Sequence, residues 1–351
     1  MPGTILGLIL IGFLQTACNY IPPVIGQEDI LMILASEEDR PLVEPFLLNV
    51  FGKEMMTGGW PEPYFKIKWG TPAEFENYKR YKSLIVVSLA NPADSTGDLL
   101  IRKILGEDRV AQALEGGNPV FVASDYLARG QMFMGLVALD AIQAQEELIR
   151  LKDWIFDQFD QQLRIRQHQA IYSRRENKKL AREMDEKYGW SLRFEGDYVT
   201  IKERSEENFV WTGRGYPYRW LSVHWVEGAD TARITPDWCW RKMDDIAGNL
   251  FQSIYIDTLL RSTELGAENG HSILILRGAW GHKEEAGGGP FFTYVFRDRE
   301  QNRIYFVTGV VFHPGAPKTL LIRRQEIITR TFHTFLKPAD AGRKINSNNL
   351  T

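Results

Sequence analysis

Cysteine is scarce in this sequence, since Cys18 and Cys239 are the only two among 351 residues. Two cysteines form at most one disulfide, which excludes a disulfide framework and a cysteine-rich metal centre. None of the six histidines forms an H-E-x-x-H pair or lies at a short metal-ligand spacing. The nearest grouping, His282 with Glu284 and Glu285, is typical of a solvated loop. We therefore predict no metal site and no cofactor.

Familiar catalytic signatures are missing as well. There is no G-x-S-x-G elbow, and Asp244 and Asp245, neighbours on an expected helix, face different ways. The stretch "RGAWGHKEEAGGGPFF" (277–292) has three glycines in a row, but aromatic residues follow where a phosphate-binding loop needs Lys-Ser/Thr and a helix. Glycine there favours a tight turn or a close backbone approach. These absences favour a non-enzymatic protein, although catalytic side chains far apart in the sequence could still meet after folding.

Strong charge and long apolar runs are also lacking. The net charge is −3, so no strong positive field attracts nucleic acid, and we predict no nucleic-acid partner. The N-terminal apolar run, Ile5 to Leu14, is about ten residues long, whereas a membrane-spanning helix needs about 20. The sequence therefore predicts no membrane-spanning helix.

The short apolar run is typical of a secretory signal. Thr16, Ala17 and Cys18 follow it, as in a bacterial lipobox, where the signal is cut before a cysteine that carries acyl chains such as palmitate. Two features depart from this pattern: Gln15 stands where a leucine is usual, and residues 1–4 contain no Lys or Arg. A plain secretory signal and an N-terminal segment packed on the core remain alternative interpretations.

The lipobox interpretation divides the N-terminus and sets a location. Residues 1–17 are then a signal peptide, Cys18 is the lipidated residue, and 18–27 form a tether in which Ile21-Pro22-Pro23 is extended. The expected partner of Cys18 is a lipid bilayer, and the expected location is the bacterial cell envelope. The sequence does not distinguish the outer from the inner membrane.

The body of the chain predicts an α+β protein with two mixed halves, 28–188 and 189–336, followed by a disordered tail at 337–351. One long helical region is expected at about 131–188, between the halves. Buried strands are expected at 29–36, 83–90 and 271–278, and "REQN" joins two strands in a hairpin. "YKSLIVVSLAN" and "YRWLSVHWVEG" match in pattern, as do "NPVFVASDYLARGQ" and "NRIYFVTGVVFHPGAPK", which suggests a diverged duplication.

Tryptophan is concentrated in the second half, where seven of the ten lie between residues 190 and 280. Rows of tryptophan stack on sugars or peptides, but on strands they more often belong to the core or the sheet face. We expect most of them in the core.

Several short motifs occur in a fixed order: "PEPYF" (61–65), "LARGQ" ending at Gln131, "FVW" (209–211), "RGAW" (277–280), "GGPF" (288–291), and Pro314 with Lys318 before the last helix. In this order they resemble the bacterial domain-of-unknown-function family 4837, over about residues 28–336. Gly130 and Gly287 depart from the family pattern. The resemblance implies an envelope lipoprotein and a shared fold, and it implies no activity.

The motif residues form the candidate binding or structural site: Gln131, Arg277, Trp280, Gly288, Gly289, Pro290, Phe291 and Lys318. The same residues are also compatible with a structural turn around a buried arginine. We favour this structural interpretation. The predicted function is a membrane-anchored binding or structural component with an envelope protein as its expected partner. The alternative is an envelope hydrolase of peptide or glycan. A concave pocket near Arg277 with two convergent carboxylates, or a histidine–carboxylate pair, would favour the hydrolase, and a flat surface would favour binding.

Overall fold

The computed structural model describes residues 20–57, 60–90, 94–228, 234–268 and 271–334. The predicted signal peptide (1–17), the lipidation residue Cys18 and the predicted tail (337–351) lie outside these residues. Within them the chain mixes helices and strands in several sheets, so the predicted α+β class is confirmed. No helix in the described part is both long and apolar enough to cross a bilayer.

The first unit is a five-stranded sheet with the order β4-β1-β5-β7-β6, parallel except for β6. Its strands are β1 (Ile30–Leu34), β4 (Lys66–Gly70), β5 (Ser83–Leu89), β6 (Val120–Ser124) and β7 (Met132–Ala138). A small ribbon of β2 (Glu54–Met56) and β3 (Pro61–Pro63) projects from it toward the rest of the chain. Because β1, β5 and β7 are buried throughout, they are continuous apolar runs rather than alternating ones.

Helices cover both faces of this sheet. One face packs on α1 (Arg40–Phe51), α5 (Ala141–Arg150) and α6 (Lys152–Tyr172) through Leu31 and Ile33 of β1. The other packs on α2 (Phe75–Tyr78), α3 (Thr96–Leu105) and α4 (Glu107–Leu114) through Met32 and Leu34. The period-2 alternation of β1 thus supplies both cores.

The predicted long helix at 131–188 needs correction. Residues 132–138 form β7, and three separate helices follow: α5, α6 and α7 (Lys178–Tyr188). The run "MFMGLVA" is uniformly apolar, and periodicity alone does not distinguish a buried strand from a helix in such a run. Leu180, Met184 and Tyr188 pack in the core of the second unit, so α7 belongs there and not to the N-terminal half.

The second unit is an eight-stranded antiparallel sheet. Its main order is β12-β14-β15-β16-β11-β10-β9, and β13 also pairs with β14. The strands are β9 (Val199–Arg204), β10 (Phe209–Arg214), β11 (Tyr218–Glu227), β12 (Ile254–Ile256), β13 (Ser262–Glu268), β14 (His271–His282), β15 (Gly288–Asp298) and β16 (Arg303–Phe312). The predicted hairpin at "REQN" joins β15 to β16. Short β8 (Trp190–Ser191) pairs with β17 (His333–Thr334).

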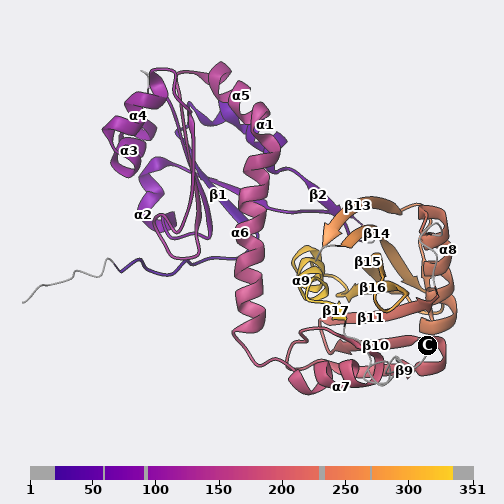
Figure 1. Cartoon of the computed structure of the whole chain (residues 1–351). Coiled ribbons are helices and arrows are strands. Elements are labelled where there is room, and N and C mark those ends of the chain that lie inside the picture. Colours follow the sequence, from indigo (N-terminus) through magenta and orange to yellow (C-terminus); the bar gives the residue numbers. More distant parts are fainter. Residues whose placement is uncertain (1–19, 58–59, 91–93, 229–233, 269–270, 335–351) are drawn as a thin grey trace, which may run out of the picture.

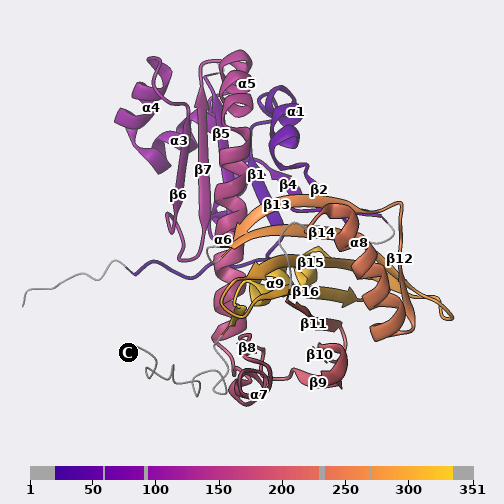
Figure 2. The same cartoon turned by 45° about the vertical axis from the view of Figure 1, so that its right-hand side comes forward.

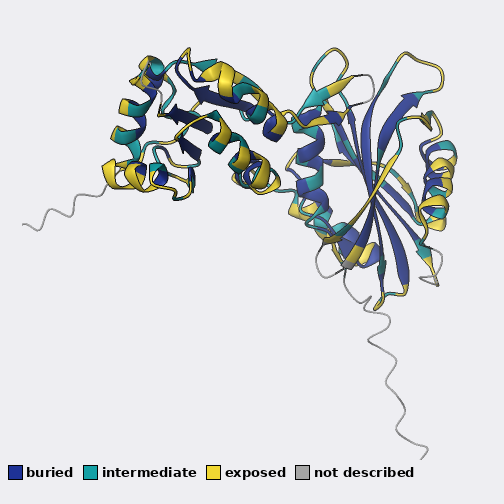
Figure 3. Ribbon diagram, turned by 90° about the horizontal axis from the view of Figure 1, so that it is seen from above, coloured by how far each residue is buried: buried dark blue, intermediate teal, exposed yellow. Residues whose placement is uncertain are grey.

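Two layers of helices cover this sheet. One face packs on α7 and α9 (Thr319–Thr329), and the other on α8 (Pro236–Asp245) with the π-helix η4 (Ile246–Phe251). The central strands, such as β15 and β16, are buried, whereas β9 and β13 are partly exposed, and so are the outer sides of α8 (Figure 3). Thr235 caps α8, because its side chain accepts a hydrogen bond from the Trp238 N–H.

The suggested duplication is wrong. "YKSLIVVSLAN" contributes β5 to a parallel sheet, whereas "YRWLSVHWVEG" contributes β11 to an antiparallel one. "NPVFVASD" leads into strand β7, while "NRIYFVTGVVF" leads into helix α9. A repeated apolar pattern here reflects two buried strands and not a repeated topology.

The two units meet along α6, which lies between them in both views (Figures 1 and 2). Its residues Ile155, Phe159 and Leu163 pack in the first core, and Ile171 packs in the second. Met55 of β2 also reaches the second core.

Candidate functional site

Gln131 is a structural residue of the first unit. It is fully buried, and its side-chain amide donates to the carbonyls of Lys79 and Tyr81 at 2.8 Å each. The side-chain oxygen of Gln131, Oε1, accepts a hydrogen bond from the Leu127 N–H at 3.1 Å. The side chain therefore joins the turns that precede β5 and β7, away from the other motif residues.

Lys318 lies at the start of α9, where two motifs, "PEPYF" and the Pro–Lys motif, come into contact. The backbone N–H groups of Lys318 and Thr319 donate to one carboxylate oxygen of Glu62, at 2.7 and 2.9 Å. Thr57 donates its hydroxyl to the other oxygen at 2.8 Å. Burial raises the pKa of Glu62, but these hydrogen bonds outweigh it and leave the pKa lowered. "PEPYF" and the Pro–Lys motif therefore form one helix cap between the units.

Arg277 on β14 lies in a cleft between the units. Its guanidinium forms ion pairs with Glu326 of α9 and, at 3.6 Å, with Glu264 of β13. Burial alone lowers the pKa of Arg277, but Glu326 reverses this and the net direction is upward. The cleft has a volume of about 530 Å³, and Tyr64, Asp160 and Arg323 also line it. The surface near Arg277 is therefore concave.

Three carboxylates of this cleft are paired with guanidinium groups. Asp160 forms ion pairs with Arg323 and, at 2.7 Å, with Arg164, and Arg277 holds Glu326 and Glu264. Glu54 and Asp157 also line the cleft, and no histidine does among the described residues. The concave shape therefore meets one condition set for a hydrolase, whereas the histidine–carboxylate pair is not assembled there in the described part of the chain.

Trp280 lies at a second place, where it lines an aromatic pocket of about 290 Å³. Gly288, Gly289, Pro290 and Phe291 are not lining residues of this pocket. Trp211 of "FVW" and Trp280 of "RGAW" line it, together with Trp220 of β11, Phe312 at the end of β16 and Phe251 of η4. Neighbouring strands of one sheet bring these segments side by side, since β10 pairs with β11, β11 with β16, and β14 with β15. We call this the aromatic pocket.

The glycines of "GGPF" allow the strands around the pocket to approach closely. Gly289 is paired with Trp280 across β14 and β15, and a Cβ on Gly289 would overlap the Val311 carbonyl oxygen. A Cβ on Gly288 would lie 2.5 Å from the Trp280 carbonyl oxygen. The Trp280 indole donates to the Val311 carbonyl at 3.3 Å. Gly288 and Gly289 therefore leave room for the backbone around Trp280 and Val311, and Pro290 and Phe291 continue β15.

The aromatic rings of the pocket contact one another in a continuous series. Trp220 lies at the centre, with ring centroids 5.6 Å from Trp211, 5.8 Å from Trp280 and 6.4 Å from Phe312. Tyr218, 39% exposed, extends the series toward solvent. Such edge and offset contacts are the arrangements that aromatic rings prefer.

A few polar groups accompany the rings. The Trp211 Nε1–H is buried and has no partner among the described residues. The Nδ1 atom of His282 accepts from the backbone N–H groups of Glu284 and Glu285, at 3.2 and 2.9 Å, so the neutral ring carries its proton on Nε2. Apolar walls with a few fixed polar groups are typical of small-molecule sites. The contact of His282 with Glu285 uses the backbone and not the carboxylate.

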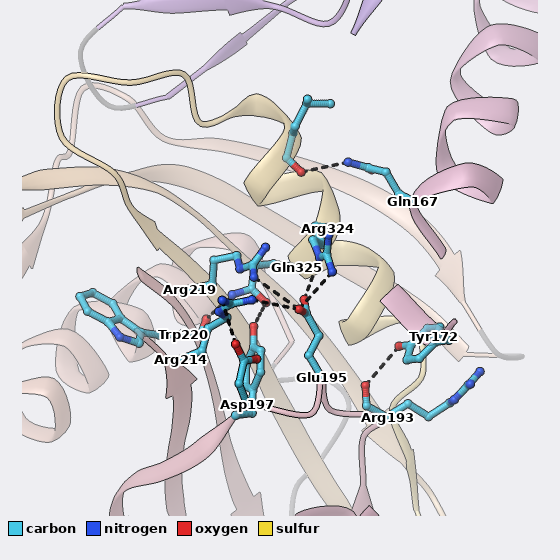
Figure 4. A network of polar contacts seen from close by, with 12 residues as sticks. Gln167, Tyr172, Arg193, Glu195, Asp197, Arg214, Arg219, Trp220, Arg324 and Gln325 are labelled. Atoms are coloured by element: carbon cyan, nitrogen blue, oxygen red, sulfur yellow. Dashed lines mark hydrogen bonds and ion pairs between the residues drawn. The ribbon is translucent and has the colours of Figure 1, made fainter. Parts of the chain in front are cut away.

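A buried charge cluster centred on Glu195 was not predicted. Its carboxylate, on a residue 6% exposed, accepts from Arg324 of α9 at 2.8 and 3.1 Å, and from Arg214 and Arg219 at 3.3 and 3.4 Å (Figure 4). Arg214 also pairs with Asp197 at 2.8 Å. The cluster fastens the segment before β9, the β10–β11 hairpin and α9 together. Its members are spread over 130 residues of sequence without a motif, so no local signal marks it.

The described residues contain no group of three or more His, Cys, Asp and Glu side chains that could hold a metal ion. Cys239 is a buried free thiol on α8, and burial raises its pKa to about 12. The sequence analysis did not identify Trp220 and Phe312 as residues of the aromatic pocket. The alternation of side chains along β11 and β16 indicates that these two residues lie on one face of a sheet, but it does not say which strands are neighbours.

Comparison with known protein families gives a match for one part of the chain. Residues 176–331, less than half of the chain, match the family described as "Domain of unknown function (DUF4837)". This confirms the family resemblance over these residues, which lie in the second unit. The predicted extent, about 28–336, is not matched before residue 176, where "PEPYF" and Gln131 lie. No curated protein matches the sequence.

Similar solved structures are distant. A Bacteroides thetaiotaomicron protein is 10% identical, with a TM-score of 0.29, and the match covers 43% of this chain and 46% of that one. The Saccharomyces cerevisiae Ran-binding protein Mog1p is 10% identical, with a TM-score of 0.30 and coverage of 42% and 90%. LpqN, involved in cell envelope biogenesis of Mycobacterium tuberculosis, is 11% identical, with a TM-score of 0.27 and coverage of 42% and 83%. Likenesses this low carry no functional argument.

Proposed function

We propose, from the membership of residues 176–331 in the DUF4837 family and from the geometry of the aromatic pocket, that this is a lipid-anchored envelope protein that binds a glycan. The observation that carries the proposal is the pocket itself, which is lined by Trp211, Trp220 and Trp280. The site is a binding site and not a catalytic one.

The chemistry of the pocket favours a sugar ring over a charged ligand. The C–H face of a sugar is apolar and stacks on indole rings, while its hydroxyl groups need hydrogen-bond partners. His282 Nε2–H supplies a donor beside apolar walls. A volume of about 290 Å³ lies at the lower end of the range for ligand pockets, which suits one ring.

The glycan proposal is tested by titration, with an N-acetylglucosamine trimer as the first probe. Binding should change tryptophan emission and saturate. Trp220→Ala and the rim variant Tyr218→Ala should each weaken binding, the former by at least about tenfold, equivalent to 1.4 kcal/mol. Trp154→Ala is the matched control, because Trp154 is 47% exposed on α6 and does not line the pocket.

Unchanged thermal unfolding must accompany any loss of binding, so that the effect is assigned to the pocket. Equal binding by Tyr218→Ala, Trp220→Ala and the parent would place the ligand elsewhere. Binding of proline-rich or aromatic peptides, with no response to saccharides of the envelope, would replace the glycan proposal with a peptide one.

The anchoring part of the proposal rests on the lipobox sequence that ends in Cys18. A cysteine carrying two or three acyl chains binds a bilayer stably, whereas one chain gives only marginal binding. Intact-mass spectrometry of protein extracted from membranes should give a chain that starts at Cys18 and carries diacylglycerol mass. Cys18→Ala should abolish both the cleavage and the added mass. An unmodified chain that begins at Met1 would contradict the anchor.

A further inference from the structure

The segment before β1 is fastened to the first unit. The Val24 N–H donates to the Arg129 carbonyl at 3.2 Å, and the Arg129 N–H donates to the Pro22 carbonyl at 2.8 Å. The Ile25 N–H donates to the Arg80 carbonyl at 2.9 Å, and the Arg80 guanidinium donates to the Pro23 carbonyl at 2.8 and 3.0 Å. Within the predicted tether at 18–27, the chain is therefore fastened to the body from Pro22 onward.

These contacts lie at one edge of the sheet. Arg80 comes shortly before β5, Arg129 shortly before β7, and the segment itself leads into β1. All three are parallel strands, so their amino ends lie at the same edge. In Figure 1 the indigo segment runs along this edge below α2, and it leaves the unit there.

The length of chain up to Cys18 sets a limit on the distance to a membrane. Only four Cα–Cα steps separate Cys18 from Pro22. A fully extended chain spans at most about 3.3–3.6 Å per residue, so these steps reach at most about 14 Å. If Cys18 is acylated, this edge of the first unit must lie close to the bilayer surface.

The side chains at this edge suit a bilayer surface. Tyr20, Ile21 and Ile25 are 75%, 41% and 42% exposed, and Arg129 is exposed beside them with no side-chain partner in the described part of the chain. Tyrosine and aliphatic side chains enter the interfacial region, and arginine is attracted by anionic headgroups. We define the amino-edge surface as Tyr20, Ile21, Ile25, Arg80 and Arg129.

We propose that the amino-edge surface rests on an anionic phospholipid bilayer. This rests on the proposed acylation of Cys18. The contact orients the whole molecule, because the edge is part of the rigid sheet of the first unit.

The test uses the acylated full-length chain in vesicles of phosphatidylethanolamine and phosphatidylglycerol. A fluorescent label sensitive to polarity is attached at Ile25→Cys or, as the control, at Leu265→Cys, which is 88% exposed on β13. Cys239 is buried and does not compete for the label. We expect blue-shifted emission and quenching by spin-labelled lipid at position 25, at least fivefold more than at position 265.

A charge variant provides the second measurement. In a chain with ten Gly/Ser residues inserted between Asn19 and Tyr20, the anchor no longer forces the contact. There Arg129→Glu should reduce quenching at position 25 by about fivefold or more. Arg241→Glu, on an exposed residue of α8, should leave it unchanged.

The outcomes separate the two proposals. An unmodified mass at Cys18 refutes the anchor. An acylated chain whose two labels are equally exposed to water refutes the amino-edge contact while the anchor stands. A label at position 25 that is shielded from water but not quenched by lipid would mean that a protein covers this surface, which also overturns the inference.

Discussion

At the scale of single residues, His224 links the fold to pH. It lies on β11, is 6% exposed, and its ring contacts the Asn208 carbonyl at 3.0 Å. Burial lowers its pKa to about 4, and nearby Lys242 adds to this. The folded protein therefore holds His224 neutral where an unfolded chain, with a pKa of about 6.5, begins to protonate it.

Acid should destabilise the protein through this residue. Because the folded pKa is the lower one, the unfolded state binds more protons between about pH 6.5 and pH 4, and the stabilisation is lost as the pH falls through this window. We expect His224 to account for about 2 kcal/mol of lost unfolding free energy between pH 7.5 and pH 5. Urea titrations of the parent, His224→Phe and the exposed control His168→Gln measure it. An unchanged pH slope in His224→Phe would refute this role.

The charge cluster of Figure 4 gives a second prediction at this scale. Glu195→Gln removes the only carboxylate that Arg219 and Arg324 share, and leaves guanidinium groups without a counter-charge in a buried place. Breaking a buried pair in this way typically costs about 3–5 kcal/mol. Chemical denaturation should show a loss of this size, against less than about 0.5 kcal/mol for the exposed control Glu206→Gln. A loss below 1 kcal/mol would mean that solvent replaces the carboxylate.

Among single residues, the sequence was informative where the local backbone geometry requires a particular residue type, such as glycine. The expectation that glycines at 287–289 permit a close backbone approach agrees with Gly289, whose place leaves no room for a Cβ. Glu195 could not be found, because its three arginine partners come from β10, β11 and α9. Long-range ion pairs leave no periodic pattern.

At the scale of elements, the cap of α9 by Glu62 is the main link between two motifs. Glu62→Ala removes an acceptor from two backbone N–H groups and the Thr319 hydroxyl. Loss of a cap costs about 0.5–2 kcal/mol, and we expect the upper half of this range because the helix end is partly buried. Thermal unfolding with Glu115→Ala as the exposed control checks it. Equal stability of the two variants would show that water caps the helix as well.

Acid should weaken the same cap. The folded pKa of Glu62 is lowered, so the stabilisation is present above the ordinary glutamate pKa and is lost as the pH falls through the lowered folded value. Hydrogen exchange at the first N–H groups of α9 should therefore speed up below about pH 4 in the parent beyond the change seen in Glu62→Gln. Identical pH responses of the two proteins would contradict this.

The elements that sequence patterns predicted well are those with clear boundaries. "REQN", for example, marks the β15–β16 hairpin. The segment 132–138 was misread because all seven residues are buried in β7, which removes the alternation that identifies a strand. The breaks at Leu151 and at 173–177 carry no glycine or proline, so three helices resembled one.

At the scale of the whole molecule, the ion pair between Asp160 of α6 and Arg323 of α9 joins the two units. Arg323 is 3% exposed, and Asp160 also pairs with Arg164. Asp160→Asn should destabilise the protein by about 3–5 kcal/mol, because it leaves a buried guanidinium. Asp160→Leu with Arg323→Met should cost less than the sum of the single changes. A double-mutant cycle by denaturant unfolding measures the difference, and strict additivity would argue against coupling.

The predicted N-terminal half, 28–188, includes α7, whereas the buried side chains of α7 pack in the second core. Leu180, Met184 and Tyr188 have the spacing of a helix that packs on something, and only the folded chain identifies that partner as the second sheet. The prediction of a duplication was wrong because apolar patterns do not indicate the direction in which neighbouring strands run. For the site, Trp280 and the glycines were identified from motifs, while the pocket needed neighbours from three other strands.

Helix α6 has a mechanical consequence. It runs for 21 residues, or about 30 Å, with one end embedded in each core. A helix that is packed in a core at each end transmits a force applied at one end to the other. A pull or a tilt applied at the edge where the N-terminal segment leaves the first sheet would therefore reach the aromatic pocket as torque on the second sheet, and would not be dissipated in a loose joint.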